Sequence, residues 1–125
     1  MARLLIVDDE EDVREFAANF FRKRKIDVIT ASNGKDAISL IEKESPELVL
    51  LDVKMTGIDG IETLRLIREK NQWVKVIMVT GRKPEEDDIL FRCRQLGVLD
   101  YIQKPLDLNQ LKNIVLGILE KPVDV

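Results

Sequence analysis

Short, wholly apolar runs recur along this chain and alternate with longer segments in which apolar residues return every three or four positions. Such apolar runs are typical of strands that are buried on both faces of a sheet. The longer segments are typical of amphipathic helices. The pattern predicts strands at 4–7, 28–31, 48–51, 74–79 and 99–102. It predicts helices at about 12–24, 35–43, 61–69 and 84–96, and a last helix from a cap at 107 to about 119.

Turn and capping residues separate these segments. Asn33-Gly34 and Ser45-Pro46 bracket the second helix, and Gly97 follows the fourth. Strand and helix alternate five times without a linker, a repeat or a low-complexity stretch. Such alternation indicates βαβ units with right-handed crossovers and a parallel sheet covered on both faces. We therefore predict a single three-layer α/β/α sandwich.

Composition narrows the functional classes. A chain of 125 residues is long enough for one well-buried core. The net charge of -3 argues against a general nucleic-acid binder, and no apolar run is long enough to span a membrane. Cys93, the single cysteine, cannot form an internal disulfide, which favours a reducing cytoplasm. With no histidine and one cysteine, any metal should be a hard cation with oxygen ligands.

Polar side chains stand where several of the predicted strands end. Asp8 and Asp9 follow the first strand, Asp52 follows the third, Thr80 ends the fourth and Lys104 comes just after the fifth. The carboxyl ends of parallel strands lie at one edge of a sheet, where open α/β folds bind ligands. Three carboxylates, a hydroxyl and an ammonium suit a divalent cation and a phosphoryl group.

Each of these residues also has a purely structural interpretation. Asp8 and Asp9 open an acidic run that could cap the following helix, and Asp52 could begin a turn. Thr80 with Gly81 is a common turn pair, and a lysine before proline, as at Lys104, is usually only a surface residue. A carboxylate after a buried strand can instead attack a phosphoryl group and form an acyl phosphate.

Four segments together carry a family resemblance: LLIVDDEEDVREF, LVLLDVKMTGIDGIETL, VIMVTGR and GVLDYIQKPLDLNQL. In this order and spacing the chain resembles the receiver domain of bacterial two-component response regulators, from about residue 3 to residue 119. The resemblance implies a flavodoxin-like (βα)5 fold with sheet order 2-1-3-4-5. It places the domain at residues 1–120, with 121–125 as a tail or the start of a linker.

The resemblance implies a role for each residue of the candidate site. Asp52 would accept phosphate, Asp9 would bind Mg²⁺ (or Mn²⁺) directly, and Asp8 would bind it mostly through water. Asp52 and the backbone carbonyl of Lys54 would complete the protein ligands. Thr80 would hydrogen-bond the phosphoryl group, and Lys104 would pair with it.

Further positions would transmit or tune the signal. Tyr101 occupies the switch position, where its ring would turn inward as Thr80 moves toward the phosphate. Gly81, Lys54 and Arg82 surround the phosphoryl position and would govern access and lifetime; the two long basic side chains suggest moderately slow autodephosphorylation. Met55 is followed by threonine where the family commonly has proline, so that loop is expected to be freer.

The function implied is a signalling switch, and not a turnover enzyme. A histidine kinase or a histidine phosphotransfer protein would phosphorylate it, and the face of the fourth helix, fifth strand and fifth helix would contact a downstream protein. Neither nucleic acid nor membrane is expected to bind this region. A phosphate-independent pseudo-receiver is the alternative. An aspartyl-phosphate phosphohydrolase is disfavoured because that chemistry usually has an acid at the position of Lys54.

Overall fold

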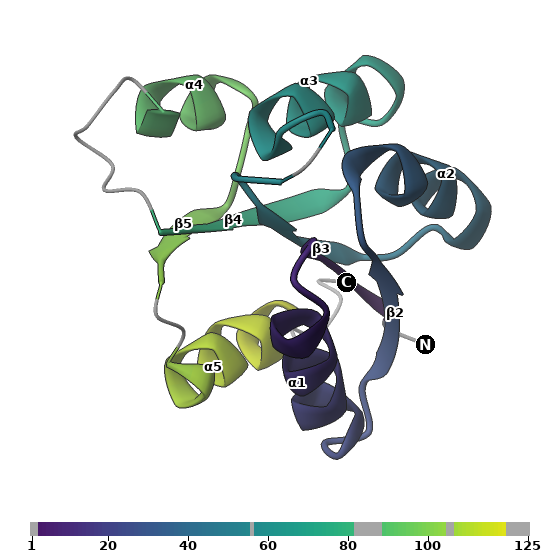
Figure 1. The fold of residues 1–125 in the computed structure, drawn as a ribbon, viewed down its shortest axis with the longest axis vertical. Helices are drawn as coiled ribbons and strands as arrows, with labels where there is room; N and C mark the ends of the chain where they lie inside the picture. Colours follow the sequence, from purple (N-terminus) through teal and green to yellow (C-terminus); the bar gives the residue numbers. More distant parts are fainter. Residues whose placement is uncertain (1–2, 56, 82–88, 105–106, 120–125) are drawn as a thin grey trace, which may run out of the picture.

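A computed structural model describes residues 3–55, 57–81, 89–104 and 107–119 of the chain. Within them strand and helix alternate as predicted, and every strand boundary lies within one residue of the sequence-based expectation (Figure 1). The elements are β1 (Arg3–Val7), α1 (Glu11–Arg22), β2 (Asp27–Ala31), α2 (Gly34–Glu44), β3 (Leu48–Asp52), α3 (Gly60–Lys70), β4 (Lys75–Thr80), α4 (Ile89–Gln95), β5 (Asp100–Gln103) and α5 (Leu108–Leu119).

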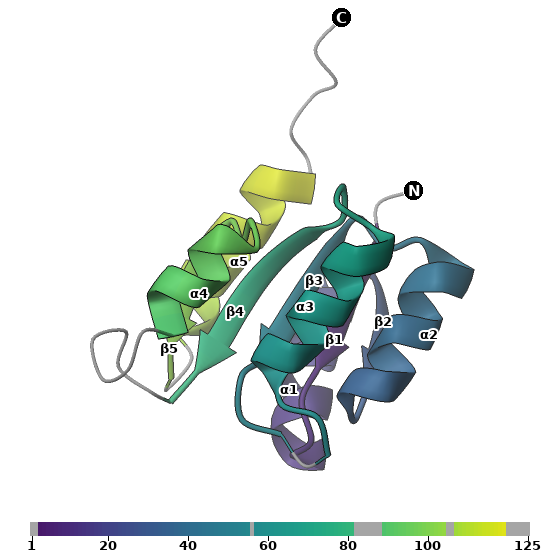
Figure 2. The same ribbon diagram turned by 90° about the horizontal axis from the view of Figure 1, so that it is seen from above.

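The strands form one parallel sheet in the order β2-β1-β3-β4-β5, which confirms the implied flavodoxin-like topology. Helices α1 and α5 cover one face of the sheet, and α2, α3 and α4 cover the other (Figures 1 and 2). The predicted three-layer α/β/α sandwich is therefore confirmed. Among the described helices, none is both long and apolar enough to cross a membrane.

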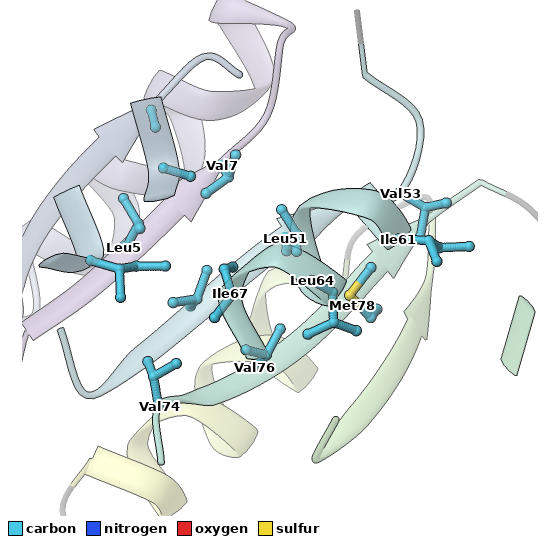
Figure 3. Close-up of a cluster of buried hydrophobic side chains, with 14 of the residues drawn as sticks. Leu5, Val7, Leu51, Val53, Ile61, Leu64, Ile67, Val74, Val76 and Met78 are labelled. Atoms are coloured by element: carbon cyan, nitrogen blue, oxygen red, sulfur yellow. The ribbon is translucent and has the colours of Figure 1, made fainter. Parts of the chain in front are cut away.

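Successive strand residues point to opposite faces and so divide the core in two. On β1, Leu5 and Val7 join the cluster beneath α2, α3 and α4, whereas Leu4 and Ile6 join the cluster beneath α1 and α5. Figure 3 shows the first cluster, in which α3 packs its apolar side chains over β1, β3 and β4. A two-sided core explains why the strands read as continuous apolar runs instead of alternating ones.

Two helix starts are fixed by capping residues, of which Asn33 lies in a predicted turn. Asn33 and Asp59 each cap a helix by accepting a backbone N–H three residues on, at 2.8 Å. Helix α1 was predicted to continue to Arg24 but ends at Arg22. Lys25 adopts a left-handed conformation (φ 64°), and the N–H of Ile26 bonds back to the Phe21 carbonyl. This turn reverses the direction of the chain between α1 and β2.

Gly60 brings the start of α3 against the end of β3. A Cβ at this position would lie 2.1 Å from the backbone oxygen of Asp52, so any side chain would push the helix off the strand. The Gly60 N–H donates to the Val53 carbonyl at 2.6 Å and closes the connection. The glycine thus fixes the β3–α3 loop around Asp52.

Helix α4 ends at Gln95, one residue before the predicted end, and Gly97 just beyond it is left-handed (φ 75°). The N–H groups of Gly97 and Val98 bond to the carbonyls of Arg94 and Cys93, the pattern of a Schellman cap. The predicted start of this helix at residue 84 lies outside the described residues. Cys93 is fully buried in the core.

Candidate functional site

The carboxyl ends of β1, β3 and β4 lie side by side at one edge of the sheet. In the parallel register, Val7 pairs with Leu51 and Asp52 pairs with Val79. Asp8, one residue past β1, is therefore carried next to Asp52, the last residue of β3. The structure thus brings together acids that stand 44 positions apart in the sequence, as the strand-end pattern predicted.

Asp8, Asp9 and Asp52 form a compact acidic cluster. Each offers a carboxylate oxygen, and these oxygens all lie within 4.8 Å of one another. Asp8 and Asp52 are almost completely buried, with 5% and 4% exposed, and Asp9 is half-buried. Clustered carboxylate oxygens fit a hard divalent cation such as Mg²⁺. Among the described residues, no histidine or cysteine belongs to this cluster.

Lys104 supplies the positive charge at this cluster. Its Nζ lies 3.2 Å from Asp52 Oδ2 and 3.3 Å from Asp8 Oδ2, so that one ammonium bridges both buried carboxylates. The Lys104 N–H also donates to the Thr80 carbonyl at 2.7 Å, which attaches this loop to the end of β4. An ammonium placed here can pair equally with an anion bound to Asp52.

Burial and charge change the acidity of the two central groups. Loss of solvent raises the pKa of Asp52 to about 6, the Asp8 carboxylate adds to the rise, and Lys104 and the Lys54 N–H oppose it. Burial alone would lower the pKa of Lys104, but the Asp52 and Asp8 carboxylates raise it overall. The lysine therefore stays protonated at neutral pH, whereas Asp52 is unusually easy to protonate.

Asp8 is restrained by contacts outside the acidic cluster. Its N–H donates to the Ala31 carbonyl at 3.2 Å, and its Oδ1 accepts the Glu10 N–H at 2.9 Å. Its carbonyl accepts a hydrogen bond from the Arg14 guanidinium at 2.9 Å. Sequence reasoning did not select Arg14, although one signal was available: it is the only basic residue within the acidic run 8–15.

The remaining predicted site residues occupy the surroundings of the cluster. Thr80 is fully buried at the end of β4, and Gly81 beside it has open space where a Cβ would stand. Lys54 is exposed, and its N–H lies 3.3 Å from Asp52 Oδ1. Tyr101 is half-buried on β5 against the core beneath α2, α3 and α4. Arg82 lies outside the described residues.

The order of elements, the acidic edge and the bridging lysine together match a known family. Residues 4–116, nearly the whole chain, match the family model described as response regulator receiver domain. The chain is a member of that family.

Two relatives of this receiver domain are each 34% identical to it but differ in length. Sporulation initiation phosphotransferase F of Bacillus subtilis is 34% identical over 90% of this chain and 90% of its own. The alkaline phosphatase synthesis transcriptional regulatory protein PhoP of the same organism is also 34% identical, but the receiver domain spans only 49% of its length. The family therefore includes both proteins of about this size and longer regulators.

Solved structures support the same assignment. Response regulator TrrA from Thermotoga maritima, crystallised in complex with Mg²⁺ and BeF, is 30% identical. The match covers 95% of this chain and all of that one, with a TM-score of 0.82. The receiver domain is thus the signalling module of a two-component response regulator.

Proposed function

We propose that this receiver domain is a phosphoacceptor switch and that Asp52 takes the phosphoryl group. The observation that carries the proposal is the placement of Asp52. It is a nearly buried carboxylate, bridged by Lys104 and gathered with two further carboxylates at the ligand-binding edge of a parallel sheet. The phosphoryl donor would be a sensor histidine kinase or a histidine phosphotransfer protein.

Phosphorylation here is a transfer between a histidine and Asp52. A carboxylate oxygen of Asp52 attacks phosphorus, the P–N bond to the donor imidazole breaks, and an acyl phosphate forms as the imidazole leaves. Hydrolysis of that acyl phosphate by water returns the free carboxylate and inorganic phosphate. The Asp52 carboxylate must be ionised to attack, so its raised pKa matters near pH 6 and below.

The metal ligands would be Asp8, Asp9, Asp52 and the backbone carbonyl of Lys54. Bound there, Mg²⁺ or Mn²⁺ would offset the charge of the carboxylates and of the incoming phosphoryl oxygens. Lys104 is already within ion-pair distance of Asp52 and needs only a small movement to pair with the phosphoryl group instead. Three acids with one lysine leave an excess of negative charge that favours a divalent cation.

The signal would then pass along β4 and β5. Thr80 would turn its hydroxyl to the phosphoryl group, and the ring of Tyr101 would move toward the space this opens. The altered surface would be that of α4, β5 and α5, where a downstream protein would bind. Gly81 leaves access to the phosphoryl group open, and Lys54 and Arg82 would set how fast water removes it.

This role is that of a signalling switch in the cytoplasm, with the domain occupying residues 1–120 and a tail or linker at 121–125. Catalysis is limited to its own phosphorylation and slow dephosphorylation. The alternative, a phosphate-independent interaction module, needs no acidic cluster, and a phosphohydrolase would favour an acid in place of Lys54.

Mass spectrometry tests the proposal directly. After incubation with acetyl phosphate and Mg²⁺, the wild-type protein should gain one phosphate, and Asp52→Asn should gain none. Asp59→Asn is a matched control, because it removes a carboxylate from the neighbouring loop while asparagine can still cap α3. Phosphorylation of Asp52→Asn at the wild-type level would refute the assignment, and no adduct on the wild type would restore the phosphate-independent alternative.

A further inference from the structure

The segment that joins β1 to α1 and the beginning of α1 are dominated by acids. Of the eight residues 8–15, six are Asp or Glu, and Arg14 is the only basic one. A lone arginine among exposed carboxylates is normally expected to extend into solvent and pair loosely. The Arg14 side chain is instead only 14% exposed, which shows that it folds back against the protein.

The guanidinium of Arg14 reaches the backbone of a predicted metal ligand. Its Nη1 donates to the Asp8 carbonyl at 2.9 Å, across six positions of sequence. Its Nε lies 3.4 Å from Glu15 Oε2, and its backbone N–H donates to the Glu10 carbonyl at 2.9 Å. The side chain thus lies beside Glu15 of α1 while its guanidinium binds the loop in front of that helix.

The carbonyl that Arg14 binds belongs to the peptide linking Asp8 to Asp9. The orientation of that peptide plane sets the backbone direction at Asp9 and hence where its carboxylate points. Asp8 has its own restraints, in the Ala31 carbonyl and the Glu10 N–H. The Arg14 contact adds a restraint on the plane of the peptide between the two acids.

We infer that Arg14 is a positioning residue for the metal site, which holds the Asp8–Asp9 peptide so that both carboxylates face Asp52. The inference rests on the proposed function only in taking the cation to bind at this cluster. Groups that orient metal ligands commonly govern affinity although they never touch the metal.

A simpler role for Arg14 predicts the opposite result. If the arginine served only to neutralise the acidic run, then its removal would increase the negative charge near Asp8, Asp9 and Asp52 and tighten Mg²⁺ binding. If it orients the ligands, then its removal weakens binding despite the extra negative charge. The sign of the change in affinity therefore distinguishes the two roles.

Isothermal titration calorimetry with MgCl₂ on the full chain measures whether the affinity for Mg²⁺ rises or falls. Arg14→Met is expected to weaken Mg²⁺ affinity about tenfold, as is typical when a group that orients metal ligands is removed. Arg14→Lys keeps the charge but not the planar fork, so its affinity should fall between those of wild type and Arg14→Met. Lys35→Met removes an exposed cation near the start of α2 and should leave affinity unchanged or slightly higher.

The outcomes separate failure of the inference from failure of the proposed function. Arg14→Met that binds Mg²⁺ as tightly as the wild type, or more tightly, would overturn the positioning role. A wild-type protein that binds no Mg²⁺ would instead refute the metal site itself. Urea unfolding identifies any variant that does not fold; if Arg14→Met is one, then Arg14→Lys decides, and wild-type affinity in that variant overturns the inference.

Discussion

At the scale of single residues, Asp52 is the carboxylate whose burial opposes folding and also the group at the centre of the proposed chemistry. A carboxylate that is 4% exposed loses nearly all of its hydration, and Asp8 beside it adds like-charge repulsion. One ammonium, from Lys104, is shared between the two acids and offsets only part of this penalty. Such an arrangement is unfavourable for folding, and it leaves at this edge the kind of carboxylate that the proposed cation and phosphoryl site requires.

The metal-free stability of Asp52→Asn should reveal this penalty. A carboxyl group whose pKa rises from 3.8 to about 6 on folding destabilises the folded state once it ionises. Asp52→Asn should therefore be more stable than the wild type at pH 7.5, by about 1–3 kcal/mol. The difference should shrink as the pH falls from 7 towards 4, because the folded wild type takes up the proton first.

Urea unfolding in EDTA at several pH values measures that difference. Asp59→Asn, in which an exposed acid is changed, controls for the loss of one negative charge and should show no comparable trend. An Asp52→Asn protein that is less stable than the wild type at neutral pH would contradict the expected burial penalty.

At the scale of elements, Arg68 joins three parts of the α3–α4 side of the molecule. From the last turn of α3, its guanidinium donates to the Leu96 and Gly97 carbonyls at the end of α4, at 2.6 and 3.2 Å. It also donates to the carbonyls of Asn71 and Val74 in the α3–β4 loop. Burial lowers the pKa of Arg68, and backbone carbonyls, including those at the negative end of α4, surround its charge.

Replacing Arg68 should loosen the α4–β5 turn. Arg68→Met leaves several carbonyls without their donor, and we expect a loss of about 2 kcal/mol in unfolding free energy. Amide hydrogen exchange at Gly97 and Val98 should accelerate. Arg65→Met, on the same helix, removes only exposed ion pairs with Glu62 and Glu69 and should change stability little. Equal effects from the two variants would show that Arg68 has no special role.

At the scale of the whole molecule, the acidic edge and the α4–β5 side are linked through two neighbouring strands. Thr80 ends β4 and pairs with Gln103 of β5, and its carbonyl accepts the Lys104 N–H. Tyr101 lies two residues back along β5 and pairs with Met78. In the proposed mechanism, a change at Asp52 would reach the surface through this short series of adjacent residues.

Removing the Thr80 hydroxyl should separate phosphorylation from the response. Thr80→Val keeps the shape of the fully buried side chain but cannot hydrogen-bond a phosphoryl group. With beryllofluoride and Mg²⁺, it should still form the adduct at Asp52 while NMR shift changes at 89–104 become smaller than in wild type. Thr80→Ser keeps the hydroxyl and should respond like the wild type. Undiminished shifts in Thr80→Val would exclude Thr80 as the link.

The sequence by itself determined the layered fold and the edge at which the site forms. Apolar runs of strand length that alternate with amphipathic helices are buried between two layers of helices, and parallel crossovers then bring the carboxyl ends of all the strands to one edge. For that reason Asp8, Asp52 and Thr80 could be placed near one another from their positions alone. The strand order came from the family resemblance, because periodicity does not say which strands are neighbours.

Only the tertiary structure decided which side chains contact one another and how burial shifts their pKa values. Lys104 bridges two acids that are far from it in the chain: Asp52 is 52 positions away and Asp8 is 96 positions away. The raised pKa of Asp52 depends on burial, which no local sequence pattern encodes. Arg14 and Arg68 read as ordinary solvated cations in the sequence, yet both fold back onto backbone carbonyls. Long side chains have many rotamers of similar energy, and the surrounding fold selects among them.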